Sequence, residues 1–410
     1  MKVRYSAALA VGALAFAVNS PARGDSIKSV SVDCDAGETI AKALTKGDER
    51  KPLLIQISGT CSESILIDRN DVLLTSTSGS TVQGTDPAIN VIVVTASRVT
   101  IDGLTVTGGR NGITGDGSPH LMVRNTVVKN TGRTGINYGH GSSGTVDGVT
   151  VQNNPRDGIA IESASATVLN SQVSQNGRHG VGVFDGGSAR IGVDNGNNAG
   201  GNTISGNVVN GVHIVFGASA FVGMNTISNN AGSGINLTNA SVDVVGGNII
   251  SGNTGTGINL RMSSAQIGDV NFGLTSVNKI TGNGNSASQG GISGFLGSSL
   301  AIRDAEITGN VGAGVIASTR TSIQIQSTTI QNNVAFAPGT GDGIRLLLGS
   351  ALFAQAPAGT VTGNAGFGLL CSDGESSAFP PNLPPTFALT AALGIGTNAL
   401  GTIFSGCTGF

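Results

Sequence analysis

Aromatic residues are scarce in this chain of 410 residues, which has no tryptophan, two tyrosines and 13 phenylalanines. Flat aromatic side chains are a common platform for stacking sugar rings. Their scarcity argues against a binding site built mainly from aromatic faces. Charge is also scarce, because Asp, Glu, Lys and Arg make up 11% of the chain, whereas an average soluble protein has roughly 25%.

The small charge imbalance is acidic, which argues against general nucleic-acid binding. Lys2 and Arg4 precede an apolar run over residues 7–18 and the small residues Ser20 and Ala22. This is the pattern of a secretory signal peptide, here residues 1–22. Its removal would take two of the 22 basic residues and leave 24 acidic ones, a net charge of −4. We therefore expect a secreted or periplasmic protein.

Later apolar runs are too short for a membrane-spanning helix, which needs roughly 20 residues, so no transmembrane segment is expected.

The four cysteines form two terminal pairs, Cys34 with Cys61 and Cys371 with Cys407. In an exported chain they predict two disulfides, one at each end, with free thiols as the alternative. No Cys-x-x-Cys spacing occurs, and no metal site is predicted.

What the chain has in abundance is glycine, 65 residues, and much of it recurs in a repeat. A Gly followed by an aliphatic residue returns every 22 to 34 residues. We call these the anchor glycines: Gly112, Gly135, Gly158, Gly180, Gly211, Gly234, Gly257, Gly291, Gly314, Gly343 and Gly368. Between anchors, three short stretches of alternating apolar residues are separated by Gly, Asn and Ser, a pattern of strands and turns.

Such short strands can bury their apolar sides only when successive repeats stack. The sequence therefore predicts an all-β solenoid: a single-stranded right-handed parallel β-helix of about 11–13 coils, with a short cap helix in residues 37–50 and an irregular C-terminal cap. A leucine-rich repeat is the alternative with a similar period, but leucine is too sparse at the apolar positions. We expect a monomer.

The expected domain limits are 1–22 for the signal peptide, 23–71 for the N-terminal cap and first strands, 72–371 for the β-helix and 372–410 for the C-terminal cap. An asparagine precedes most anchors and should form a ladder at one corner, where its amide can bond the turn backbone. The expected ladder residues are Asn130, Asn154, Asn176, Asn207, Asn230, Asn253, Asn283, Asn310, Asn333 and Asn364.

The segments IQISGTCSESILIDRNDVLLTS and VTIDGLTVTGG, followed by coil after coil, resemble the pectin-lyase-like superfamily of right-handed β-helix proteins. The resemblance covers nearly the whole mature chain. It implies polysaccharide lyases, glycosidases and epimerases, and also repeat proteins without known activity. The polygalacturonase Asp-Asp and Arg-Ile-Lys elements are missing, which puts hydrolysis by a pair of carboxylates in doubt.

Four arginines stand two residues before consecutive anchors: Arg110, Arg133, Arg156 and Arg178. Stacked coils would place them in a row with about 4.8 Å between neighbours. Guanidinium groups match carboxylates, so the row could bind an extended anionic glycan. The alternative is a solvated turn whose charges are met by nearby acidic groups.

Asp157 and His179 each stand one residue before an anchor glycine. They should be neighbours on adjacent coils, where the carboxylate would raise the pKa of the imidazole. This pair, with Tyr138, is the candidate catalytic set for moving a proton. Glu162 and His140 complete the candidate substrate-binding set with the four arginines. No cofactor is expected; calcium is conceivable, but no calcium-binding motif supports it.

Two functions are compatible with these features. The first is a non-catalytic polysaccharide-binding or cell-envelope scaffold, which the missing family motifs favour. The alternative is a carbohydrate-active enzyme, either a polysaccharide lyase or a uronate epimerase. A copper-accessory role is a minor third option, because His and Met are few.

Overall fold

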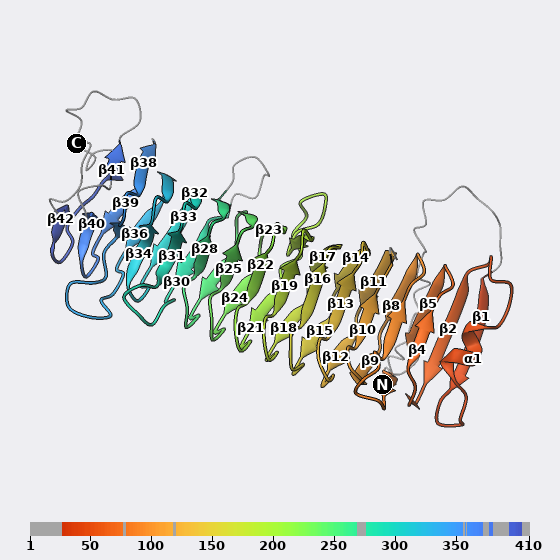
Figure 1. Ribbon diagram of the computed structural model, residues 1–410. Coiled ribbons are helices and arrows are strands. Elements are labelled where there is room, and N and C mark those ends of the chain that lie inside the picture. The colour runs from red at the N-terminus through yellow and green to blue at the C-terminus, as the bar shows by residue number, and fades with distance from the viewer. Residues whose placement is uncertain are drawn as a thin grey trace, which may run out of the picture.

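Three parallel sheets wind around a common core and build an elongated solenoid (Figure 1). The computed structural model describes residues 27–76, 79–117, 120–268, 276–355, 357, 359–371, 377–379 and 393–403. The expected signal peptide, residues 1–22, lies outside this range. Within the described residues, no helix is long and apolar enough to cross a membrane.

Each sheet takes one strand from each successive coil, and the neighbours pair in parallel. Sheet A consists of β1 (Lys28–Asp33), β2 (Leu53–Ser58), β5 (Val72–Ser76), β8 (Val99–Asp102), β11 (His120–Arg124), β14 (Ser143–Asp147), β17 (Ser165–Leu169), β20 (Ser188–Ile191), β23 (Ser219–Val222), β26 (Ser241–Val244), β29 (Ser264–Ile267), β32 (Ser299–Arg303), β35 (Ser322–Gln326), β38 (Ala351–Gln355) and β41 (Ser377–Phe379). Sheet B consists of β3 (Thr60–Cys61), β6 (Thr81–Gly84), β9 (Thr105–Gly108), β12 (Val127–Lys129), β15 (Thr150–Gln152), β18 (Gln172–Ser174), β21 (Thr203–Ser205), β24 (Thr226–Ser228), β27 (Ile249–Ser251), β30 (Asn278–Thr281), β33 (Ala305–Thr308), β36 (Thr329–Gln331) and β39 (Thr360–Thr362). Sheet C consists of β4 (Ile65–Ile67), β7 (Ile92–Val94), β10 (Ile113–Gly115), β13 (Ile136–Gly139), β16 (Ile159–Glu162), β19 (Val181–Phe184), β22 (Val212–Val215), β25 (Ile235–Thr238), β28 (Ile258–Arg261), β31 (Gly290–Phe295), β34 (Ala313–Ser318), β37 (Ile344–Leu346), β40 (Phe367–Cys371) and β42 (Gly401–Ile403).

The predicted all-β solenoid is confirmed, with about 14 coils rather than 11–13. The difference arises at both ends, because β4 and β7 near the N-terminus and β42 near the C-terminus are not preceded by an anchor glycine. Inward residues such as Ile159, Val181 and Val212 pair in register and are fully buried. Burying each such side chain contributes about 1.5–3 kcal/mol.

The anchor glycines are required by close approach between coils. A Cβ on Gly158 would lie 2.8 Å from the carbonyl oxygen of Gly180 and 2.7 Å from the amide nitrogen of Asn176. That amide belongs to the predicted ladder, in which Asn154 donates to Asn176, and Asn176 donates to Asn207. The repeated Gly and the repeated Asn are therefore two parts of one corner.

One predicted ladder member is wrong. Asn130 is an exposed turn residue with φ of 53°, and Thr131 takes the ladder position, where its hydroxyl donates to the Asn154 amide oxygen. At the other end, the ladder continues from Asn364 to Asn398. A second ladder, which the spacing of the repeat did not predict, joins the amides of Asn202, Asn225, Asn248 and Asn278 at the corner between sheets A and B.

The cap helix and one of the two predicted disulfides are present as expected, and the C-terminal cap differs in part from the prediction. The cap helix α1 (Ile40–Leu44) buries Ile40, Ala43 and Leu44 against the first coil, as predicted. Cys34 and Cys61 form a disulfide. Cys371 is also disulfide-bonded, while its expected partner Cys407 lies outside the described residues. β41 and β42 extend sheets A and C, so parts of residues 372–410 continue the solenoid.

Candidate functional site

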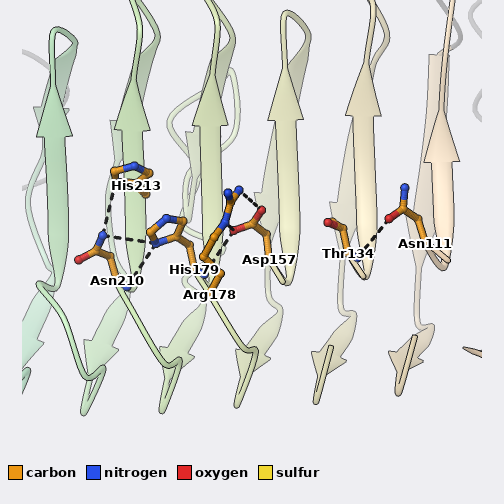
Figure 2. A network of polar contacts seen from close by, with 7 residues as sticks. All are labelled: Asn111, Thr134, Asp157, Arg178, His179, Asn210 and His213. Atoms are coloured by element: carbon orange, nitrogen blue, oxygen red, sulfur yellow. Dashed lines mark hydrogen bonds and ion pairs between the residues drawn. The ribbon is translucent and has the colours of Figure 1, made fainter. Parts of the chain in front are cut away.

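The residues just before the anchor glycines form a hydrogen-bonding column at the corner that leads into sheet C (Figure 2). The amide oxygen of Asn111 accepts the backbone N–H of Thr134 at 3.1 Å. Asp157 accepts the N–H of His179 at 3.3 Å, and Asn210 accepts that of Ser233 at 2.9 Å. Each side chain therefore satisfies a buried backbone donor of the next coil, which explains why polar residues occupy this column.

Asp157 is buried, with 1% of its surface exposed, and its charge is met by Arg178. The Arg178 guanidinium donates from Nε to Oδ1 at 2.8 Å and from Nη2 to Oδ2. Such a two-pronged pair fixes both side chains. The same guanidinium lies over the Phe184 ring, 5.1 Å from its centroid. Arg178 is thus the member of the predicted row that is neutralised within the protein.

The imidazoles of His179 and His213 stack on adjacent coils, with ring centroids 4.1 Å apart. Nδ1 of His179 accepts the backbone N–H of Asn210 at 3.3 Å, and the Asn210 side-chain amide nitrogen lies 3.3 and 3.4 Å from Nδ1 of His179 and of His213. Burial, with the nearby His213 and Arg178 adding to it, lowers the pKa of His179 to about 2. Burial and Arg178 lower the pKa of His213 to about 4.

The predicted increase in the His179 pKa is therefore wrong. Asp157 directs both carboxylate oxygens to Arg178 and accepts the backbone N–H of His179, so it does not contact the imidazole. The outcome is a neutral histidine that serves as a hydrogen-bond acceptor for the backbone. The two residues therefore lie on adjacent coils as predicted, whereas the predicted contact between the Asp157 carboxylate and the His179 imidazole does not form.

Phe184 was not among the predicted site residues. Its ring packs on the outer face of sheet C against Ala160 and Val215. Gly182 makes room for it, since a Cβ there would lie 2.3 Å from the ring. Together with Arg178 and the two histidines, Phe184 forms a compact cluster that stiffens this corner. A glycine two residues before an outward phenylalanine was the available sequence signal.

The arginine row has the expected register. The backbone N–H of Arg156 donates to the carbonyl of Arg133 at 2.8 Å, and that of Arg178 donates to Arg156 at 3.0 Å. Gly132 donates to Gly109 at 2.7 Å, which places Arg110 one coil before Arg133. Burial and the charges of Arg178 and Arg133 lower the pKa of Arg156, so neighbouring guanidinium groups repel one another.

Three of the four arginines keep their charge unpaired. Among the described residues, Arg110, Arg133 and Arg156 form no ion pair. Their guanidinium groups also form no hydrogen bond with another side chain there. Asp157 and, after it, Glu162 at the end of β16 attract Arg156 weakly, without forming an ion pair with it. We call Arg110, Arg133 and Arg156 the arginine strip. It is a line of positive charge about 10 Å long at the coil spacing of a parallel sheet.

The other predicted residues lie away from this strip. His140 follows the C-terminal end of β13, whereas the arginines precede the strands of sheet C. Its Nδ1 lies 2.6 Å from the Asp116 carboxylate, and both side chains are exposed. Tyr138 points into the core, is fully buried and donates to the carbonyl of Leu121 at 3.0 Å. Burial raises the pKa of this phenol far above its usual range. The candidate catalytic residue Tyr138 therefore lies inside the core, away from the arginine strip.

The described residues contain one group of three potential metal ligands, Cys34, Cys61 and Glu63. The two sulfurs of this group are bonded to each other. The Glu63 carboxylate accepts the backbone N–H groups of Ile40 and Ala41 at 2.7 and 3.2 Å. These groups are therefore occupied by the N-terminal cap, and the cluster is explained without a metal ion.

The fold and this corner define a parallel β-helix repeat protein that carries a basic strip on its exterior. The chain belongs to the family described as right handed beta helix region, whose model matches residues 63–223 and 210–382. It is therefore a right-handed β-helix. No curated protein sequence matches it.

Several solved structures share the fold at low identity. The A-module of mannuronan C-5 epimerase AlgE4 from Azotobacter vinelandii is 14% identical, with a TM-score of 0.53 over 90% of this chain and 92% of that one. The catalytic unit of an α-1,3-glucanase from Streptomyces thermodiastaticus is 14% identical, with a TM-score of 0.52 over 92% and 69%. The periplasmic alginate epimerase AlgG is 12% identical, with a TM-score of 0.50 over 92% and 84%.

Proposed function

We propose that this chain is an exported, monomeric β-helix that binds an anionic polysaccharide along the arginine strip without transforming it. The supporting observation is that Arg110, Arg133 and Arg156 lie on consecutive coils and form no ion pair among the described residues, and that Arg133 and Arg156 repel each other. A polymer that carries a carboxylate on each sugar would supply the missing negative charges. Two of the similar structures are named as epimerases of mannuronan and alginate, which fits this ligand class.

The enzyme alternative, a lyase or uronate epimerase, needs a group that removes a proton beside the sugar carboxylate. His179 uses Nδ1 for the backbone of Asn210, and its pKa is lowered to about 2. Tyr138 is enclosed in the core. Neither group favours proton transfer to a ligand on the surface, so binding without chemistry is the better supported function.

Export rests on the pattern of residues 1–22 and is consistent with the Cys34–Cys61 disulfide, since such bonds persist mainly in oxidising compartments. A secreted or periplasmic protein of this kind would meet polysaccharides of the cell envelope or of the surroundings. The elongated solenoid suits an extended ligand, because the strip runs along its long axis.

The test is affinity electrophoresis in native gels that contain alginate or polygalacturonate. We expect retardation of the wild type that weakens with salt, because the contacts are ionic. The double variant Arg133→Ala/Arg156→Ala should bind at least about tenfold more weakly, the equivalent of roughly 1.4 kcal/mol. Its thermal midpoint should not change, since both side chains are unpaired.

The matched control is Lys129→Ala/Arg320→Ala, which removes two positive charges elsewhere and should retain binding. Equal weakening in both double variants would show a general charge effect and contradict the strip. Absence of retardation of the wild type by either polymer would also contradict the proposal. Appearance of unsaturated uronate absorbance on incubation with these polymers would instead establish the lyase alternative.

A further inference from the structure

The turns that lead from sheet C into sheet A carry a line of exposed apolar side chains. Phe216, Met262 and Leu296 are 63%, 50% and 39% exposed. Each is the first residue after a strand of sheet C, and backbone hydrogen bonds join these turns from coil to coil, with Asn239 between Phe216 and Met262. We call Phe216, Met262 and Leu296 the apolar ridge. At the coil spacing of a parallel sheet it is about 14 Å long.

The local backbone does not favour apolar residues on the ridge. Its three members have φ of 59°, 50° and 56°. This left-handed region is unfavourable for bulky side chains, and Asn, Asp and His are the residues enriched in it. Other coils follow that preference, because His140, Asp185 and Asn239 occupy the same position with φ of 48°, 53° and 51°. The ridge therefore departs from the local rule without a gain inside the fold, which indicates a contact outside the chain.

The ridge projects from the solenoid, because it lies where two sheets meet at an outward corner. Gly217 and Gly297 directly follow Phe216 and Leu296. A Cβ on either glycine would meet no atom within 4 Å apart from those of its chain neighbours, so the space outside this corner is open. A rigid, flat partner would contact only the tips of such a line. A soft layer that closes around the side chains would bury them more completely.

The charge around the ridge has one sign. Five successive turns, taken with their flanking strand ends, comprise residues 215–219, 238–241, 261–264, 295–299 and 318–322. They contain two arginines, Arg261 and Arg320, and no acidic residue. Both arginines are exposed, and within the described part of the chain neither forms an ion pair. A partner that carries negative charge beside an apolar layer would complement this corner.

We propose that the apolar ridge docks on the surface of an anionic phospholipid bilayer. The ridge side chains would enter the boundary between headgroups and acyl chains, and Arg261 and Arg320 would contact lipid phosphates. The arginine strip lies elsewhere, since its residues precede β10, β13 and β16, whereas the ridge follows β22, β28 and β31. Membrane docking therefore goes beyond the polysaccharide binding proposed above and does not depend on it.

The test is co-sedimentation of the full chain with vesicles of phosphatidylcholine mixed with an equal part of phosphatidylglycerol. The ridge variant is Phe216→Asn/Met262→Asn/Leu296→Asn. Because asparagine already occupies this position at Asn239, the variant should fold with a thermal midpoint no lower than that of the wild type. We expect it to bind the vesicles at least about tenfold more weakly than the wild type.

The matched control is Ile89→Asn/Val208→Asn/Phe336→Asn, which removes three apolar side chains from the turns between sheets B and C. These residues are 49%, 60% and 56% exposed. The control should bind the vesicles as the wild type does, and so should Arg133→Ala/Arg156→Ala, which removes the arginine strip. Arg261→Ala and Arg320→Ala should each weaken binding about fivefold. The ridge variant should still be retarded by alginate, which separates the two sites.

The proposal is wrong if the wild type does not sediment with the anionic vesicles, or if the ridge variant sediments equally well. Equal weakening in the control variant would show general apolar adsorption, and loss of binding in Arg133→Ala/Arg156→Ala would place the lipid on the arginine strip; either result overturns the ridge. A lower thermal midpoint of the ridge variant would show that its apolar side chains serve the fold. A wild-type dimer that the ridge variant dissociates would identify the ridge as a contact between two copies instead.

Discussion

His179 and His213 remain neutral because they are enclosed between coils and lie near Arg178. A histidine with a depressed pKa in the folded state binds its proton more readily when the chain unfolds, where the pKa is about 6.5. Its contribution to stability is therefore complete above pH 6.5. It decreases as the pH falls from 6.5 toward the folded values of about 4 for His213 and about 2 for His179.

We predict that acidification from pH 6.5 to 4.5 lowers the free energy of unfolding by up to about 1.4 kcal/mol per pH unit for each of these histidines. The measurement is urea unfolding at several pH values. His179→Asn is the comparison, because asparagine at Asn111 and Asn210 shows that an amide oxygen can accept the same backbone bond. This variant should lose stability about half as steeply with pH. Parallel curves for the two proteins would contradict the assignment of His179.

At the scale of single residues, the sequence placed Asp157 and His179 on adjacent coils correctly, because the anchor glycines define the register. It could not show which atoms would meet. The oxygens of the Asp157 carboxylate accept from the guanidinium of Arg178 and from the backbone N–H of His179. The inward position of Tyr138 was predictable, because it stands two residues after Ile136, pairs in register with Ile161, and alternate residues of a strand face the same side.

The asparagine ladders are the elements that specify how coils stack. Asn230 is fully buried and donates from its amide to the carbonyl of Ile204 and to Asn253. Its amide oxygen also accepts the backbone N–H and the side-chain amide of Asn207. Replacement by alanine would leave several buried groups without partners, each at a cost of about 1–3 kcal/mol.

We therefore predict that Asn230→Ala lowers the free energy of unfolding by at least about 3 kcal/mol, as measured by urea denaturation. The neighbouring variant Asn229→Gly is the control. Asn229 is exposed with φ of 55°, a conformation that glycine adopts freely, so little change is expected. A ladder residue with no larger effect than its neighbour would show that the stacked amides contribute no net stability.

One of the two asparagine ladders was predictable from the repeat, and the other was not. The column through Asn154 and Asn176 was predictable, because asparagine recurs at a fixed distance before the anchor. Asn130 stands five residues before Gly135, whereas Asn154 and Asn176 stand four before their anchors, and the ladder position in that coil belongs to Thr131. The second ladder escaped notice because Ser171 precedes Asn202 in it and the inserted residues 193–200 interrupt its spacing.

For the whole molecule, stability comes from contacts between neighbouring coils, so the ends are the places where unfolding should begin. The N-terminal end is tied down at three points. The Cys34–Cys61 disulfide joins the turn after β1 to β3. Glu63 holds the first N–H groups of α1, and the buried Arg69 donates to four carbonyl groups between Leu44 and Lys51.

We predict that Cys34→Ser/Cys61→Ser loosens the first coils without unfolding the solenoid. In the chain-entropy model, closing a loop of this length contributes about 3–4 kcal/mol. Because Glu63 and Arg69 keep their bonds, the variant should fold, but amides in β1, β2 and α1 should exchange hydrogen faster. Amides from β16 to β28 should exchange as in the wild type, since they contact only their own neighbours. Hydrogen exchange with mass spectrometry measures this, and equal acceleration along the chain would show that the solenoid opens as one cooperative unit rather than from its end.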